Sequence, residues 1–300
     1  MRDTPGGRPP CLHERASDGQ RSSNSQAARR KRKVRRAAAG LLKLFSVPFL
    51  RQWMKTISVI LTIGSCPSAD GSQSERGETL MLEKMDLFFE NRLEEYEEHM
   101  LSGIEGAREF YPYTAALLPG NKGCEVLDLG CGTGLELEAY FLRNPEARVT
   151  GIDLSEAMLG ALADKFPDRC ADGRLRLIPG SYFDVPLPEK AYDAAVSVES
   201  LHHFTQEQKL PLYRRLCRSL KENGFFILTD YFAESEEQER EYFCTLERMK
   251  REQNLSDDGF YHYDTPLTVE HEMEILKEAG FSRIRILKNL GATCTVEAVK

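Results

Sequence analysis

The sequence of 300 residues lacks the features that mark several protein classes. Its eight cysteines form no C-x-x-C pair and do not cluster with histidine, which excludes the usual zinc motifs and a disulfide framework. No uncharged stretch approaches the roughly 18 residues that a membrane-spanning helix needs. The sequence therefore predicts a soluble cytoplasmic protein with reduced thiols, no membrane association and no metal site.

Basic charge is concentrated before residue 80 and scarce after it. Residues 1–80 contain 15 Lys and Arg against 6 Asp and Glu, whereas residues 81–300 contain 25 against 41. The block RRKRKVRR repels itself, so the first segment is predicted to be disordered and the second to be the folded domain. The basic segment is either a nucleic-acid-binding or nuclear-targeting arm, a cleaved presequence, or sequence upstream of a natural start at Met81 or Met85.

Apolar periodicity in the folded part alternates between helical and strand patterns. Helical spacing predicts two amphipathic helices before the first strand, around residues 86–100 and 107–117. Seven strands are predicted at residues 124–130, 148–154, 175–181, 191–200, 224–232, 283–289 and 293–299, most of them separated by helices. The fold class is α/β: a doubly wound, mostly parallel, seven-stranded Rossmann-like sheet with an antiparallel C-terminal hairpin at its edge.

The stretch EVLDLGCGTG ends the first strand with Asp128 and then alternates glycine with other residues, at Gly130, Gly132 and Gly134. Glycines at a strand's carboxyl end permit positive φ and a close approach by a ligand, and the next helix offers free N–H groups. Leu135 stands where a dinucleotide-binding fingerprint needs glycine. The charge of Asp128 also repels a pyrophosphate, so a ligand with a cationic end is favoured.

A second carboxylate, Asp153, ends the next strand. At that place it can accept both hydrogen bonds of a ribose diol. Together the two acidic residues predict a nucleoside that carries an ammonium group.

These stretches resemble the motifs of class I S-adenosylmethionine-dependent methyltransferases, over about residues 86–300. The matching stretches are VLDLGCGTG, GIDLSEAML, GSYFDVPLP, YDAAVSVESLHHF and LTVEHEMEILKEAGF. The resemblance implies that S-adenosylmethionine is the cofactor. The layout of the C-terminal third also resembles, loosely, enzymes that modify the tRNA wobble uridine.

The resemblance implies a role for each matched position. The methionine end of the cofactor would be held by Asp128, Gly130, Gly132 and Gly134. Asp153 would bind the ribose hydroxyls, with Leu154 and Met158 beside the adenine. Ser181 stands where the family commonly has an aspartate for the adenine amino group, which is a departure from the pattern. The predicted cofactor site is completed by Cys131, Tyr182 and Val198.

The stretch ESLHHF follows the fourth strand and is predicted to lie over the site. Glu199 and His203 are candidate catalytic residues, because either side chain can take a proton from a substrate near neutral pH. The alternative for these residues is capping and packing, which is favoured for His202. Tyr96 on the first helix either folds over the cofactor or packs on the apolar face of the helix, and packing is favoured. The loop at residues 261–266 collects aromatics and either lines a substrate pocket or simply connects two helices.

The predicted activity is transfer of a methyl group from S-adenosylmethionine to a nucleophile. The sulfonium is already activated, so positioning carries most of this chemistry and a general base is optional. A small-molecule acceptor is favoured over tRNA, because the acidic balance of residues 81–300 opposes phosphate binding. A tRNA-modifying methyltransferase and a non-catalytic cofactor-binding or partner-binding module are the alternatives. The acceptor atom and the oligomeric state are left open.

Overall fold

The computed structural model describes residues 81–256 and 259–300. The prediction that residues 1–80 are disordered lies outside these residues. Within the described ranges, no helix is both long and apolar enough to cross a membrane.

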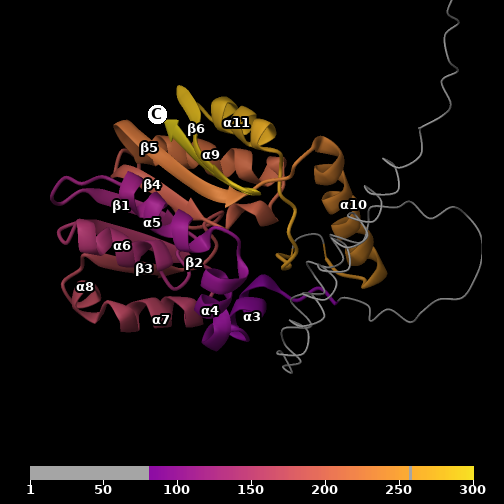
Figure 1. The fold of residues 1–300 in the computed structure, drawn as a ribbon, viewed down its shortest axis with the longest axis horizontal. Helices are drawn as coiled ribbons and strands as arrows, with labels where there is room; N and C mark the ends of the chain where they lie inside the picture. The colour runs from indigo at the N-terminus through magenta and orange to yellow at the C-terminus, as the bar shows by residue number, and fades with distance from the viewer. Residues whose placement is uncertain (1–80, 257–258) are drawn as a thin grey trace, which may run out of the picture. The chain divides into compact units, whose positions relative to one another are not determined.

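A seven-stranded sheet forms the centre of the described domain (Figure 1). Its strands are β1 (Glu125–Leu129), β2 (Arg148–Asp153), β3 (Leu175–Pro179), β4 (Tyr192–Val198), β5 (Leu220–Tyr231), β6 (Arg283–Leu290) and β7 (Thr293–Val299). They lie in the order β3-β2-β1-β4-β5-β7-β6. The first five strands are parallel, and β7 pairs antiparallel with both β5 and β6. The predicted α/β class and edge hairpin are confirmed.

Helices cover both faces of the sheet (Figure 1). Alternate residues of each strand point to opposite sides, and the apolar residues on each side pack in a separate hydrophobic cluster. In β1, Leu127 packs in one hydrophobic cluster and Val126 in the other. The first cluster includes residues of α9 (Gln206–Ser219) and α11 (Val269–Glu278). The second includes residues of α5 (Ala107–Leu117), α6 (Leu135–Arg143) and α7 (Glu156–Lys165). The further elements are α8 (Pro167–Ala171), the 3-10 turn η1 (Leu201–His203) and α10 (Glu236–Glu252).

Among the described residues, three helices precede β1 where the helical spacing predicts two. They are α3 (Met85–Glu90), α4 (Leu93–Gly103) and α5. The chain leaves helical geometry at Arg92, with φ −118° and ψ 8°. There the Arg92 guanidinium donates to the Phe88 carbonyl oxygen at 2.9 Å and pairs with Glu83 at 2.7 Å. Because these contacts satisfy the end of α3, the prediction of one continuous helix is wrong.

A buried ion pair joins α9 to α11. Lys209 Nζ lies 2.6 Å from Glu272 Oε2, and the Tyr213 hydroxyl donates to the other carboxylate oxygen. The side chains of Lys209 and Glu272 are 2% and 0% exposed. Buried charges need partners, so this contact holds α9 and α11 together. The first of these helices follows η1, and the second follows the loop at residues 259–268.

Candidate active site

A pocket lies at the carboxyl ends of β1, β2 and β4. The strand order reverses between β1 and β4, and doubly wound sheets bind ligands at such a point. The residues that line the pocket are Met85, Phe89, Tyr96, Gly130, Gly132, Asp153, Leu154, Met158, Gly180, Ser181, Tyr182, Val198, Glu199, Ser200, His203, Phe204 and Phe260.

The turn between β1 and α6 forms one wall of this pocket. Gly130 and Gly132 have φ values of +76° and +49°, which favour glycine. A Cβ on Gly130 would lie 2.0 Å from Ser200 Oγ, so no side chain fits there. A Cβ on Gly132 would come no closer than 3.6 Å to its neighbour, Tyr96 Oη. The open space beside Gly132 therefore lets a ligand reach the backbone.

Asp153 holds the turn from the β2 side. Its Oδ2 accepts a hydrogen bond from the Gly132 N–H at 2.8 Å, and its Oδ1 accepts one from the Ser155 N–H at 2.9 Å. Burial raises the pKa of Asp153, while these donors oppose the rise. Each carboxylate oxygen keeps a further lone pair, which is available to a diol in the pocket.

Asp128 lies beneath the turn and outside the pocket lining. It is 1% exposed, and neither carboxyl oxygen has a hydrogen-bond partner of normal geometry among the described residues. Burial, followed by the charge of the buried Glu136, raises the pKa of Asp128 well above its usual range. A cationic group bound at the turn would supply the missing counter-charge.

Ten of the thirteen predicted site residues line the pocket, and Asp128, Cys131 and Gly134 do not. The Cys131 thiol is buried against Gly151, where an added Cβ would lie 2.7 Å from the sulfur. Gly134 has φ +74°, and an added Cβ would lie 2.5 Å from Leu162 Cδ1. Cys131 and Gly134 therefore support the turn from within the core.

Two predicted residues of the third motif line the pocket after β3. Ser181 Oγ accepts from the Phe183 N–H at 3.2 Å, so it also caps the local turn. The Tyr182 hydroxyl lies 3.1 Å from Ser200 Oγ and burial raises its pKa. Ser181 thus offers a hydroxyl to the pocket where the family pattern has a carboxylate.

Glu199 follows β4 in a strained conformation, with φ +49°. Its N–H donates to the Thr229 carbonyl oxygen at 2.9 Å, and Thr293 Oγ1 donates to its Oε1 at 3.0 Å. Burial and then the charge of Asp230 raise the pKa of Glu199 to about 8. A carboxyl group that titrates near neutrality therefore lies in the pocket wall, and such strain is characteristic of functional positions.

His203 lines the pocket from η1, and its neighbour His202 does not. His202 is buried, and its Nδ1 lies 2.6 Å from Asp230 Oδ1. Burial lowers the pKa of His203, whereas Asp230 raises that of His202 against the opposing effect of burial. The packing role favoured for His202 thus includes a buried ionic contact.

Several lining residues come from segments for which the sequence favours ordinary packing, Tyr96 among them. Met85, Phe89 and Tyr96 reach the pocket from α3 and α4, and Phe260 reaches it from the loop before α11. The spacing of these residues along α3 and α4 is the same as that of ordinary core residues. Only the three-dimensional arrangement shows that they line a pocket. The aromatic character of the neighbouring loop was the one signal that pointed to Phe260.

Comparisons with known proteins find methyltransferases. A family model described as a methyltransferase domain matches residues 126–224. The chain is 27% identical over 220 residues to an uncharacterised methyltransferase of Bacillus licheniformis, which covers 71% of this chain and 96% of that protein. The matched region is therefore a methyltransferase domain.

This methyltransferase shares shorter regions with better-defined enzymes. It is 30% identical over 129 residues to tRNA (carboxymethyluridine(34)-5-O)-methyltransferase of Arabidopsis thaliana, covering 42% of this chain and 29% of that protein. It is 29% identical over 117 residues to 27-O-demethylrifamycin SV methyltransferase of Amycolatopsis mediterranei, covering 39% and 42%. The chain therefore spans less than half the length of either relative.

The fold agrees with a solved methyltransferase structure. Human N-acetylserotonin methyltransferase, solved in complex with S-adenosylmethionine, superposes with a TM-score of 0.51 at 16% identity, over 72% of this chain and 59% of that chain. The residues of the pocket can be compared with the groups of S-adenosylmethionine, the cofactor with which that neighbour was solved. The open side of Gly132 suits the methionine end of S-adenosylmethionine, and the Asp153 lone pairs suit its ribose hydroxyls. Among the described residues the Asp128 carboxyl has no hydrogen-bond partner, which suits the ammonium group.

Proposed function

We propose that this methyltransferase transfers a methyl group to a small, partly apolar nucleophile. The observation that carries the proposal is the apolar and aromatic share of the pocket lining, formed by Met85, Phe89, Tyr96, Phe204 and Phe260. A concave site with this lining suits a small organic acceptor. The Amycolatopsis relative is also named for a small-molecule acceptor.

We assign the cofactor to the half of the pocket formed by the turns after β1, β2 and β3, called here the cofactor half. Gly130, Gly132 and the underlying Asp128 would hold the methionine end, and Asp153 would hold the ribose. The adenine would lie along a surface formed by Leu154, Met158, Ser181, Tyr182 and Val198. Cys131 and Gly134 would support the turn.

The acceptor would occupy the half formed by α3, α4, the turn after β4 and the loop before α11, called here the acceptor half. Its nucleophilic atom attacks the methyl carbon in line with the carbon–sulfur bond, which breaks as the sulfonium becomes a neutral thioether. Holding the two reactants in line supplies most of the rate. Glu199 would accept a proton released by the acceptor, and His203 would contact the acceptor through Nε2.

The charge distribution supports a small acceptor over tRNA. Several basic residues of the described domain are paired with acidic ones. Arg214 on α9 pairs with Glu278 at 2.9 Å, and Arg285 on β6 pairs with Glu297 at 2.7 Å. Nucleic-acid binding depends on clustered cations that release counterions from phosphates, and these paired arginines do not supply such a cluster.

The test is to supply methyl-labelled cofactor together with either total tRNA or a small-metabolite extract. The full chain and a variant that starts at residue 81 are both expected to label metabolites. Efficient labelling of tRNA by the shortened protein would overturn the proposal. Labelling of tRNA by the full chain alone would make residues 1–80 a tRNA-binding arm. Intact cofactor binding without transfer to either fraction would support the non-catalytic module.

We also propose that residues 81–300 form the methyltransferase domain and that the protein is cytoplasmic. The six described cysteines are all free, which is consistent with a reducing compartment. Deletion of residues 1–80 is expected to leave the melting temperature, and its rise with S-adenosylmethionine, unchanged. A large loss of either would contradict the assigned domain boundary.

A further inference from the structure

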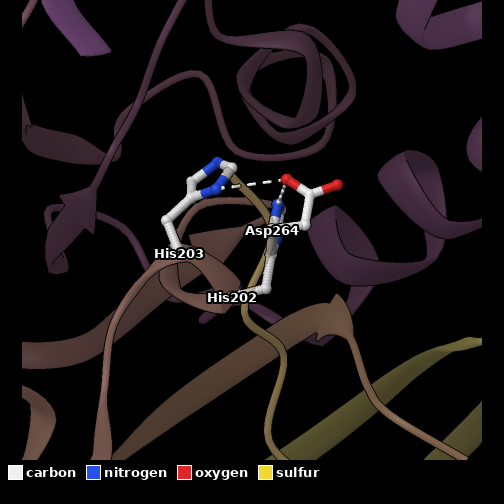
Figure 2. A group of neighbouring side chains, drawn as sticks. All are labelled: His202, His203 and Asp264. Atoms are coloured by element: carbon white, nitrogen blue, oxygen red, sulfur yellow. Dashed lines mark ion pairs between the residues drawn. The ribbon is translucent and has the colours of Figure 1, made fainter. Parts of the chain in front are cut away.

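Two histidines and an aspartate meet beside the acceptor half in an arrangement that methyl transfer itself does not require (Figure 2). His202 and His203 lie in η1, and Asp264 lies in the loop before α11. His203 Nδ1 is 3.2 Å from Asp264 Oδ1, and His202 Nε2 is 3.5 Å from the same oxygen. Figure 2 shows both rings directed at the carboxylate. Three groups with metal-ligating atoms therefore converge on one point.

The spacing of these atoms suits a shared cation. One ligand atom from each side chain lies within 4.8 Å of the others. Ligand atoms about 2.1 Å from a common metal ion are about 3.0 to 3.4 Å apart at octahedral or tetrahedral angles. The distances of 3.2 and 3.5 Å to Asp264 Oδ1 are already close to this range. His203 Nδ1 also lies 3.3 Å from the Tyr263 carbonyl oxygen, so ion binding would displace the Nδ1 proton and turn the ring from this contact.

The orientation of His202 provides a second, independent observation. Its Nδ1 lies 2.6 Å from Asp230 Oδ1, which can keep the Nδ1 proton in place when Nε2 gives up its own proton to an ion beside Asp264. Asp230 is in turn fixed by the N–H groups of Leu201 and Tyr231, each at 2.9 Å. Metal-ligating histidines characteristically donate their other ring N–H to a carboxylate in this way. The side chain behind the ligand is thus already in place.

The local charge also calls for a cation. Asp230 and Asp264 bring two carboxylates to this region, with side chains 3% and 29% exposed. Among the residues the structure describes, their ion pairs involve only the two histidines. Protonation of His202 balances one negative charge, whereas a divalent ion balances both.

We propose that His202 Nε2, His203 Nδ1 and Asp264 Oδ1 bind a divalent first-row transition-metal ion such as Mn²⁺, Fe²⁺, Co²⁺ or Zn²⁺. Two imidazole nitrogens and one carboxylate suit these ions, whereas Mg²⁺ and Ca²⁺ prefer oxygen ligands. Three protein ligands leave coordination positions for water or for an atom of the acceptor. Because His203 also lines the pocket, the ion would lie at the wall of the acceptor half.

The test measures binding on the full chain and does not depend on methyl transfer. Protein stripped with a chelator is titrated calorimetrically with Mn²⁺ and Co²⁺, and with Mg²⁺ for comparison. One equivalent of each transition-metal ion is expected to bind, with Mg²⁺ far weaker. Asp230→Asn is expected to weaken Co²⁺ binding about 10- to 100-fold, and Asp264→Asn at least as much. His271→Asn, which changes a histidine outside the cluster, should leave the affinity unchanged.

Two further measurements keep the test decisive. The visible absorption of bound Co²⁺ distinguishes nitrogen and oxygen ligands from cysteine thiolates, and S-adenosylmethionine affinity shows that each variant is folded. Absence of stoichiometric binding, a thiolate spectrum, or an affinity unaffected by both Asp264→Asn and His203→Asn would each overturn the proposal. The proposed function is judged separately, by cofactor binding and methyl transfer in the stripped protein.

Discussion

The cofactor half and the acceptor half of the pocket are built from different parts of the chain. In the cofactor half, short turns after neighbouring strands present backbone groups, and the Gly132 N–H is held at 2.8 Å by Asp153. In the acceptor half, side chains from α3, α4, η1 and the loop before α11 form the surface. Backbone groups are independent of side-chain identity and suit a cofactor that is the same in every reaction. Side chains differ between proteins and can select among acceptors. This difference is consistent with our proposal that one half binds the cofactor and the other selects the acceptor.

The largest expected effect separates the two halves at Gly132. Gly132→Arg fills the open side of the turn in a conformation with φ +49°, so cofactor binding should be lost. Gly160→Arg is the matched control, because no atom lies within 4 Å of an added Cβ there. Calorimetric titration with S-adenosylmethionine measures both. Equal affinity in the two folded variants would contradict the assignment of the cofactor half.

The acceptor half is tested at Glu199. Glu199→Gln keeps the side-chain shape but removes the proton acceptor, so methyl transfer should fall about 10²- to 10⁴-fold with cofactor affinity unchanged. The exposed Glu207→Gln on α9 serves as the control. Single-turnover transfer from labelled cofactor to the metabolite extract gives the rate. An undiminished rate would show that positioning alone is sufficient.

The ion pair between α9 and α11 tests how the acceptor half is supported. Lys209→Met leaves Glu272 buried without its partner, so the free energy of unfolding should fall by about 3 to 5 kcal/mol. Lys221→Met breaks a partly exposed pair with Asp193 and should cost less than about 1 kcal/mol. Urea unfolding measures both values. Similar losses in the two variants would mean that burial of the pair does not affect stability. The double variant Lys209→Met, Glu272→Met should recover part of the lost free energy of unfolding, because no unpaired charge is then buried.

The smallest expected effect concerns pH and the contact between α10 and α11. Glu239 accepts hydrogen bonds from the Thr268 N–H at 2.6 Å and from His271 Nδ1 at 2.9 Å, and the latter contact raises the pKa of His271. A raised histidine pKa stabilises the fold below the ordinary histidine pKa, and this stability is lost as pH rises through the higher, folded-state value. His271→Asn should therefore lower the melting temperature slightly in mildly acidic buffer and hardly at all in alkaline buffer. A loss that grows with pH would contradict this sign.

The sequence predicts the order and type of the elements because their signals are local. Alternating apolar patterns indicate the strands, and the glycine before β7 marks the hairpin. The sequence pattern does not predict the break between α3 and α4, because the break depends on contacts of the Arg92 side chain with the Phe88 carbonyl oxygen and with Glu83. The apolar spacing itself continues across the break. A contact between side chain and backbone therefore overrides the periodicity.

The candidate site shows the same difference between local sequence signals and contacts made by the fold. Gly130, Gly132 and Asp153 are predictable because two short motifs carry them. The expectation that no metal site exists rests on the absence of a metal-binding spacing in the sequence. The pair His202 and His203 supplies two ligating groups, but the carboxylate that meets them comes from a distant loop. Spacing rules do not register a cluster assembled by the fold.

The position of β7 has a consequence for protein synthesis. Although it comes after every other strand, β7 lies between β5 and β6. Until residues 293–299 leave the ribosome, the edge of β5 that faces away from β4 has no partner strand. Unpaired apolar edges favour aggregation. The same segment carries Thr293, whose hydroxyl anchors Glu199 in the pocket. The nascent chain therefore completes its sheet and the pocket wall that carries Glu199 in a single late step.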